Sequence, residues 1–292
     1  MNYVTLNDGT QVPSLGMGTW YLGEGRRSAA EEERALRAGI EAGITLIDTA
    51  EMYGDGAAEE LLGRAIRGYD RDELFLVSKV YPHNAGRRNI FRACEDSLRR
   101  MGVDCLDLYL LHWRGSVPLQ ETVDCMEELI RQGRIARWGV SNLDLEDMEE
   151  LFQCDGGDGC AVNQVLYHLG SRGTEYCLRP WMEQNHVAMM AYCPLAQGGR
   201  LRRGLVNSPA VRQTAEESGL TPMQVLLAFV LAQKNTIAIP RTGSADHALL
   251  NAETADHALT PEQLERLNKA FPAPRRRDNQ ADSCRSNLNG TP

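Results

Sequence analysis

The chain has 292 residues, which is enough to bury one large core and is close to the usual size of a single α/β barrel. Apolar residues make up 42% and charged residues 24%, as is ordinary for a globular protein. The formal net charge of −9 argues against a nucleic-acid partner, because proteins that bind nucleic acids usually carry a basic face.

The sequence shows no targeting or membrane signal. The first ten residues lack a basic segment followed by an apolar run, and no stretch approaches the roughly 20 apolar residues that span a bilayer. Eight cysteines are scattered along the chain without a CxxC pair, so we interpret them as reduced thiols and expect a cytoplasmic protein. No group of residues has metal-ligand spacing, and we expect no metal.

The predicted elements begin with a β-hairpin, because Asp8-Gly9 separates two short β-prone runs. Apolar, strand-like runs then alternate with amphipathic stretches. The predicted strands are 15–20, 44–48, 74–79, 106–112, 136–141, 160–164, 187–192 and 236–240. The predicted helices are 29–42, 57–67, 88–100, 120–131, 145–152, 175–184, 209–218, 222–233 and 261–270.

About eight β-then-α units in one chain predict an α/β fold, a (β/α)8 TIM barrel with an N-terminal β-hairpin. A doubly wound sheet is the competing arrangement. Gly16-Met-Gly18 does not complete the GxGxxG fingerprint of such sheets, since Tyr21 stands where the third glycine is required. Without a linker or a break in composition, residues 1–292 are predicted to form one domain, in which 272–292 are a polar C-terminal tail.

Four polar residues fall at the carboxyl ends of predicted strands, where barrel enzymes carry their active sites. They are Asp48, Tyr53, Lys79 and His112. Each has an ordinary structural explanation, such as a loop cap, a half-buried aromatic, an exposed strand end or a buried histidine. Their joint placement at one rim favours a functional site instead.

Carbonyl reduction explains this combination. The reaction needs a hydride donor and a proton donor, and a tyrosine hydroxyl supplies the proton when a nearby ammonium lowers its pKa from about 10. We therefore expect Lys79 to lower the pKa of Tyr53, Asp48 to hold Lys79, and His112 to orient the carbonyl.

Several segments resemble the signature blocks of the aldo-keto reductases, in family order and at family-like spacing. The blocks are Gly16–Trp20, Leu46–Gly54, Val77–Lys79, Asp107–Trp113 and Trp138–Asn142, and the similarity runs from about Val4 to Phe271. The resemblance implies a catalytic tetrad of Asp48, Tyr53, Lys79 and His112, in which Tyr53 is the general acid.

The resemblance also implies a nicotinamide cofactor bound across the barrel mouth. Ser141, Asn142 and Gln164 are expected to bind the carboxamide, and Tyr192 is expected to stack on the nicotinamide ring. The rest of the implied cofactor site comprises Thr19, Leu195, Arg241, Thr242, His247 and Asn251. Arg241 and His247 stand where the family commonly has lysine and arginine, so we expect NADPH with a reduced preference over NADH.

Trp20, Tyr81 and Trp113 match positions that line family substrate pockets, which predicts an aromatic, largely apolar cup. The segments Gly18–Gly23, Val165–Arg172 and Ala270–Pro274 resemble those of bacterial methylglyoxal reductases of this superfamily. The resemblance therefore implies the reduction of small aldehydes and ketones, above all methylglyoxal and related 2-oxoaldehydes. A small carbonyl compound is the only expected partner, and the oligomeric state is not predicted.

Two alternatives of other classes stay open on the sequence. One is a non-catalytic NADPH-binding regulatory protein on the same barrel, since a fold does not fix a function. The other is an isomerase or aldolase of an unrelated barrel, in which Lys79 forms a Schiff base.

Overall fold

The structure is a computed structural model that describes residues 2–275. Strands β1 (Tyr3–Thr5) and β2 (Gln11–Pro13) pair antiparallel with Val4 opposite Val12, so the predicted hairpin is confirmed. Asp8 accepts a hydrogen bond from the backbone N–H of Thr10 at 2.9 Å, which closes the turn. The hairpin covers the amino-terminal end of the barrel, because Val4 and Val12 pack with the residues that fill the barrel.

Eight parallel strands follow in the ring order β10-β9-β8-β7-β6-β5-β4-β3. They are β3 (Gly16–Gly18), β4 (Leu46–Asp48), β5 (Phe75–Val80), β6 (Leu108–Leu111), β7 (Trp138–Ser141), β8 (Val162–Leu166), β9 (Ala188–Tyr192) and β10 (Thr236–Ile239). Parallel bridges from Leu15 to Ala238 and from Gly18 to Arg241 join β3 to β10 and close the ring. The α/β barrel prediction is confirmed, and the doubly wound sheet is wrong.

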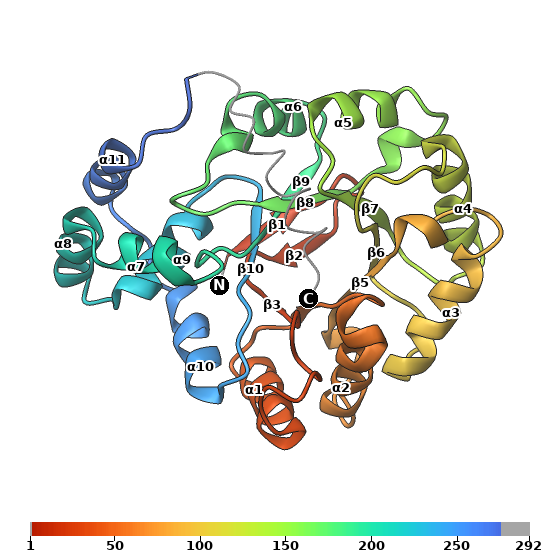
Figure 1. Ribbon diagram of the computed structural model, residues 1–292, viewed down its shortest axis with the longest axis horizontal. Coiled ribbons are helices and arrows are strands. Elements are labelled where there is room, and N and C mark those ends of the chain that lie inside the picture. Colours follow the sequence, from red (N-terminus) through yellow and green to blue (C-terminus); the bar gives the residue numbers. More distant parts are fainter. Residues whose placement is uncertain (1, 276–292) are drawn as a thin grey trace.

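Helices surround this ring of strands (Figure 1). They are α1 (Ala29–Glu41), α2 (Ala57–Ala65), α3 (Ile90–Met101), α4 (Leu119–Arg131), α5 (Leu145–Phe152), α6 (Leu178–Gln184), α7 (Gly199–Val206), α8 (Pro209–Ser218), α9 (Pro222–Leu231), α10 (Ala245–Thr254) and α11 (Pro261–Ala270). Thr221 and Thr260 cap α9 and α11 in capping boxes, and each is followed by proline at the first helical position.

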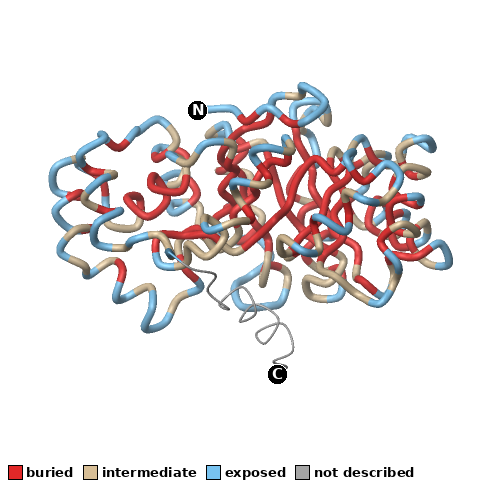
Figure 2. The backbone as a smooth tube through the Cα atoms, turned by 90° about the horizontal axis from the view of Figure 1, so that it is seen from above, coloured by how far each residue is buried: buried red, intermediate tan, exposed pale blue. Residues whose placement is uncertain are grey.

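Burial is concentrated in two layers of apolar side chains. One layer lies between the strands and the helices, and the smaller one fills the barrel itself. Figure 2 shows the buried backbone at the centre of the molecule, with exposed segments at its edges. The strands are buried on both faces, which explains why their sequences are continuous apolar runs rather than alternating ones.

Two helices, α7 and α10, are absent from the sequence prediction. In α7 only Leu205 is buried, and α10 buries the small residues Ala248 and Ala252 with Thr254, so neither presents a strong apolar stripe. Helix α6 begins at Leu178 rather than at Glu175, because residues 173–175 form a separate 3₁₀ turn. The predicted tail lies outside the described residues from position 276 onward, and the single domain stays a prediction.

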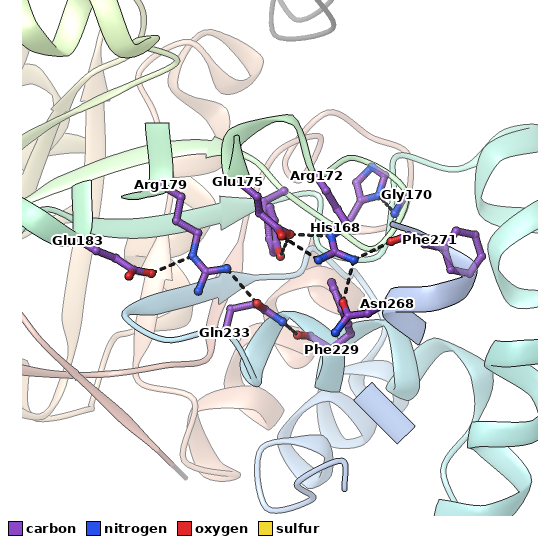
Figure 3. Close-up of polar contacts among 11 residues, drawn as sticks. His168, Gly170, Arg172, Glu175, Arg179, Glu183, Phe229, Gln233, Asn268 and Phe271 are labelled. Atoms are coloured by element: carbon purple, nitrogen blue, oxygen red, sulfur yellow. Dashed lines mark hydrogen bonds and ion pairs between the residues drawn. The ribbon is translucent and has the colours of Figure 1, made fainter. Parts of the chain in front are cut away.

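A polar network fastens the loop after β8 to the last helix (Figure 3). The Arg172 guanidinium donates to both oxygens of Glu175 at 2.6 and 2.7 Å, to the Asn268 side chain at 2.8 Å and to the Phe271 carbonyl at 2.6 Å. Tyr167 donates a further bond to Glu175 at 2.6 Å. The network holds the end of α11 against the carboxyl-terminal side of the barrel. Within residues 2–275, no helix is long and apolar enough to cross a membrane.

Candidate active site

The four predicted catalytic side chains meet at one rim of the barrel. Asp48 ends β4, Lys79 lies in β5, His112 directly follows β6, and Tyr53 opens the 3₁₀ turn after β4. Lys79 Nζ lies 2.7 Å from Asp48 Oδ2 and 3.1 Å from the Tyr53 hydroxyl, and the Tyr53 and His112 rings are 5.7 Å apart at right-angled orientation. Neighbouring parallel strands end at the same edge, so the sequence prediction placed these residues together correctly.

The Lys79 ammonium is enclosed by acceptors. Its three N–H groups are directed at Asp48 Oδ2, at the Thr49 carbonyl (2.8 Å) and at the Tyr53 hydroxyl oxygen, and its side chain is 0% exposed. Because Lys79 donates to Tyr53, the phenolic proton of Tyr53 stays available for donation to another molecule. A Schiff base at Lys79 is disfavoured, since the amine is fully buried and does not line the cavity described below.

The predicted lowering of the Tyr53 pKa is wrong for this structure. Burial, followed by the negative charge of Asp48, raises the pKa of Tyr53 well above its usual value, so the phenol stays protonated. The pKa of His112 is well below its usual value because of burial and the charge of Lys79, which keeps the imidazole neutral. Its Nδ1 atom has no hydrogen-bond partner among the described residues.

The ion pair beneath Tyr53 is held in a dry environment. Burial raises the pKa of Asp48 and lowers the pKa of Lys79, while the mutual attraction of the two groups opposes both shifts. Such a pair is costly to desolvate, and it therefore indicates a functional role more than a stabilising one.

A cavity of about 790 Å³ opens at this rim. Asp48, Tyr53 and His112 form part of its wall, together with Trp20 and Met52. Its size falls within the range of small-molecule and cofactor sites.

The three residues predicted to bind the carboxamide and Tyr192, which was predicted to stack on the nicotinamide ring, form a connected group beside the tetrad. Tyr192 donates to Asn142 Oδ1 at 2.9 Å, and Asn142 Nδ2 lies 3.1 Å from Ser141 Oγ. Ser141 in turn donates to the backbone carbonyl of Gln164 at 2.9 Å. The Gln164 side chain donates from Nε2 to Asp48 Oδ1 at 2.7 Å. All four residues line the cavity together with Asp48, so the structure brings them together with the tetrad.

The wall of the same cavity also carries basic side chains. Leu195, Arg241, Thr242, His247 and Asn251 line the cavity, as expected for cofactor residues. Arg241 donates from Nε to the Trp20 carbonyl at 2.8 Å and from Nη2 to the Tyr21 carbonyl at 3.3 Å.

Three further predicted residues lie elsewhere. Thr19 is fully buried outside the cavity wall, and its hydroxyl has no partner among the described residues. Tyr81 and Trp113 are also outside that wall: Trp113 packs on the His112 ring with centroids 4.8 Å apart, and Tyr81 lies 5.9 Å beyond Trp113. Of the three aromatic residues predicted to form the cup, Trp20 alone lines the cavity, and Trp113 packs on the His112 ring instead.

Among the cavity residues that the sequence analysis missed are Tyr21, Arg26 and Arg202. The Arg26 guanidinium lies over the Tyr21 ring at 3.6 Å, and Tyr21 stacks on Trp20 with centroids 4.3 Å apart. Arg202 donates to the carbonyls of Leu195 and Ala196 at 3.0 and 2.6 Å. These residues come from loops and from the unpredicted α7, so no hydrophobic period pointed to them. Nearby glycines at 23, 25, 198 and 199 were the available signal of special loop geometry.

Comparisons with known proteins agree with this site. The model of the "Aldo/keto reductase family" matches residues 14–271. The chain is 54% identical over 264 residues to methylglyoxal reductase of Escherichia coli (strain K12), covering 90% of this chain and 93% of that relative. It is 32% identical to glyoxal reductase of Bacillus subtilis (strain 168), covering 91% of each. A crystal structure of the Klebsiella pneumoniae aldo-keto reductase in complex with NADPH superposes with a TM-score of 0.91 at 52% identity, covering 95% of this chain and 97% of that one. The resemblance found in the sequence is confirmed, and the chain belongs to the aldo/keto reductase family.

Proposed function

We propose that this protein reduces small aldehydes and ketones to alcohols with NADPH, and that methylglyoxal and similar 2-oxoaldehydes are its preferred substrates. The observation that carries the proposal is the Tyr53 hydroxyl, which lines the cavity and accepts a hydrogen bond from the buried Lys79 ammonium. The substrate class rests on the Escherichia coli and Bacillus subtilis relatives, which are a methylglyoxal reductase and a glyoxal reductase.

The residues of the cavity fit a phosphorylated dinucleotide. Neutral amide and hydroxyl groups of Ser141, Asn142 and Gln164 surround the catalytic end, which suits a carboxamide. In the same cavity wall, Arg241 and His247 suit a phosphate. Nε and one N–H of Nη2 of Arg241 are engaged with backbone carbonyls, which leaves further N–H groups of the guanidinium for an anion.

In the proposed reaction a nicotinamide cofactor, when bound in this cavity, would supply the hydride for the carbonyl carbon. Tyr53 donates its phenolic proton to the carbonyl oxygen, so the C=O double bond becomes an alcohol and the tyrosinate is left beside Lys79. Lys79 stabilises this anion at 3.1 Å, and solvent later restores the proton. The neutral His112 imidazole orients the carbonyl oxygen, with Trp20 in the same cavity wall.

The raised pKa of Tyr53 determines which form of the phenol is present before the reaction. A phenol whose pKa is raised by burial holds its proton until the oxygen of the substrate becomes negative during hydride transfer. Lys79 acts on the tyrosinate that forms and leaves the resting hydroxyl protonated. The site is thus suited to reduction, in which the protonated phenol is the reactant.

The proposal is tested by the loss of NADPH absorbance with methylglyoxal, for the wild type and the variant Tyr53→Phe side by side. We expect rapid oxidation by the wild type and a loss of at least about 100-fold in kcat for the variant, with NADPH binding retained. The same assay with NADH tests the cofactor preference, which equal kcat/KM for the two cofactors would contradict. A wild type that binds NADPH but reduces no carbonyl compound would refute the function, and an active Tyr53→Phe would refute the role of Tyr53.

We also propose a cytoplasmic location. This rests on the scattered cysteines of the sequence, which suit a reducing compartment.

A further inference from the structure

The buried Asp48 carboxylate is held by two donors from different sides of the barrel. Lys79 on β5 donates to Oδ2, and Gln164 Nε2 on β8 donates to Oδ1, both at 2.7 Å. Strands β4 and β8 lie half a turn apart in the ring of eight, so the bond between Gln164 and Asp48 crosses the barrel interior. Asp48 and Gln164 are each 2% exposed, so water has little access to replace either donor.

The chemistry of the neighbours fixes which way the Gln164 amide faces. A carboxylate only accepts hydrogen bonds, so the nitrogen of the amide must face Asp48, and the same nitrogen lies 2.9 Å from the sulfur of Met190. The amide oxygen is therefore on the other side of the group. Since Gln164 lines the cavity, this oxygen is the atom that the amide has left to offer a bound molecule.

From this arrangement we propose that Gln164 has a role beyond the cofactor contact that the family resemblance implies: it is a positioning residue for the reaction, and its nitrogen holds the Asp48 carboxylate against Lys79. The proposal rests on the proposed function, because it assigns Gln164 a role in that reaction. Gln164 acts on Tyr53 through two intermediate contacts, from Asp48 to Lys79 and from Lys79 to the phenol.

The physical reason for such a residue is the desolvation of Asp48. Burial raises the pKa of Asp48, and the hydrogen bonds from Lys79 and Gln164 work in the opposite direction. Removing the amide donor leaves one carboxylate oxygen unpaired in a dry interior, which shifts Asp48 towards its neutral form and weakens its hold on Lys79. The titratable groups around this ion pair are Tyr53, after β4, and His112, after β6, together with Glu59 on α2, whose charge acts on Lys79. The Cys193 thiol, after β9, acts in turn on Tyr53.

The variant Gln164→Met tests the proposal, because methionine has a similar length but no hydrogen-bond donor. The measurements are NADPH affinity by quenching of tryptophan fluorescence, and the rate of hydride transfer at saturating NADPH. We expect weaker NADPH binding and, separately, a rate about 10- to 100-fold lower, as for the loss of one hydrogen bond to a charged group.

The same substitution in an Asp48→Asn background separates the two roles. There the carboxylate is gone, so Gln164→Met should weaken NADPH binding by the same factor but lower the residual rate less than about 3-fold. Ser141→Ala is the matched control, because the Ser141 hydroxyl bonds the backbone of Gln164 and not Asp48. Its effect on the rate should be equal in the two backgrounds. Equal rate losses for Gln164→Met in both backgrounds would overturn the proposal.

A second variant and a readout without substrate complete the test. In Gln164→Glu, a protonated carboxyl group donates to Asp48 at low pH and an ionised one repels it, so the rate of reduction should fall steeply as the pH rises.

The second readout is thermal unfolding without cofactor or substrate. Gln164→Met should be destabilised more at pH 8 than at pH 5, and this difference should vanish with Asp48→Asn. If Gln164→Met is destabilised equally at both pH values, the proposed role of Gln164 is overturned. If the wild type reduces no carbonyl compound but the pH-dependent destabilisation by Gln164→Met is observed, only the proposed function is overturned.

Discussion

Replacing Lys79 by methionine should destabilise the protein and abolish its activity together. The ammonium is 0% exposed and makes one hydrogen bond to a carboxylate and two to neutral oxygens. The charged hydrogen bond contributes about 2 kcal/mol and each of the other two about 1 kcal/mol. Their sum of about 4 kcal/mol agrees with the loss of about 3–5 kcal/mol that is typical when a buried ion pair is broken. Methionine fills the space of the lysine stem, so we expect a loss of about 3 kcal/mol.

Thermal unfolding followed by circular dichroism measures this loss. An unfolding entropy of about 2.1 cal/mol/K per residue converts 3 kcal/mol into a decrease of about 5 °C in Tm for a chain of 292 residues. The double variant Asp48→Asn with Lys79→Met carries no buried charge at this site and should recover to within about 2 °C of the wild type. Lys269→Met, at an exposed position on α11, is the matched control and should leave Tm unchanged within about 1 °C.

The pH dependence has a definite sign. Without Lys79 the pKa of Asp48, which burial already raises, rises further, and a carboxyl group with a raised pKa costs stability as the pH increases through that value. Lys79→Met should therefore lose less stability at pH 5 than at pH 8. A variant that melts within about 1 °C of the wild type at pH 7, or a double variant less stable than Lys79→Met, would refute this account of the ion pair.

Two further predictions concern other buried groups. Arg172→Met should cost about 3 kcal/mol, because Arg172 and Glu175 are only 8% and 15% exposed, and should speed hydrogen exchange in α11. Burial alone would raise the pKa of Glu175, but the bonds from Arg172 and Tyr167 lower it overall. The part of the wild type's advantage that comes from the ion pair should therefore shrink as the pH falls from about 4.5 through the lowered pKa of Glu175, while the bonds of Arg172 to Asn268 and Phe271 persist; an advantage that does not change with acidification would contradict the pairing. For catalysis, the kcat of reduction should not change from about pH 7 to 9, because the pKa of Tyr53 is raised well above its usual value of about 10 and the pKa of His112 is well below its usual value of about 6.5. The measurement is kcat as a function of pH. An inflection near pH 7 that disappears in His112→Gln would contradict this prediction, because it would show that the imidazole becomes charged in this range.

The sequence predicted the barrel and the meeting of the four catalytic residues for the same reason. Continuous apolar runs that alternate with amphipathic helices indicate parallel strands, and parallel strands end at one rim, so Asp48, Lys79 and His112 had to converge there. The positions of Tyr81 and Arg26 depend instead on loop conformation. Glu51 accepts a bond from the backbone N–H of Tyr81 at 2.6 Å, and the Tyr81 ring stacks on His83 outside the cavity wall. No period in the sequence encodes such contacts.

The wrong prediction for the pKa of Tyr53 has a different origin. The neighbouring residues were predicted correctly, but the removal of water from the site was not taken into account. Lys79 does lie 3.1 Å from the phenol, as the residue types suggested, but the pKa also depends on how dry the site is and on the charge of Asp48 behind it. The sequence shows which charged residues lie near a group, but it does not show how far water reaches them. The same omission hid the role of Gln164: a neutral amide becomes important only once the carboxylate beside it has been removed from water. With the proposed role of Gln164, the candidate tetrad includes the support of a fifth side chain, across the barrel, that no charge pattern in the sequence singles out.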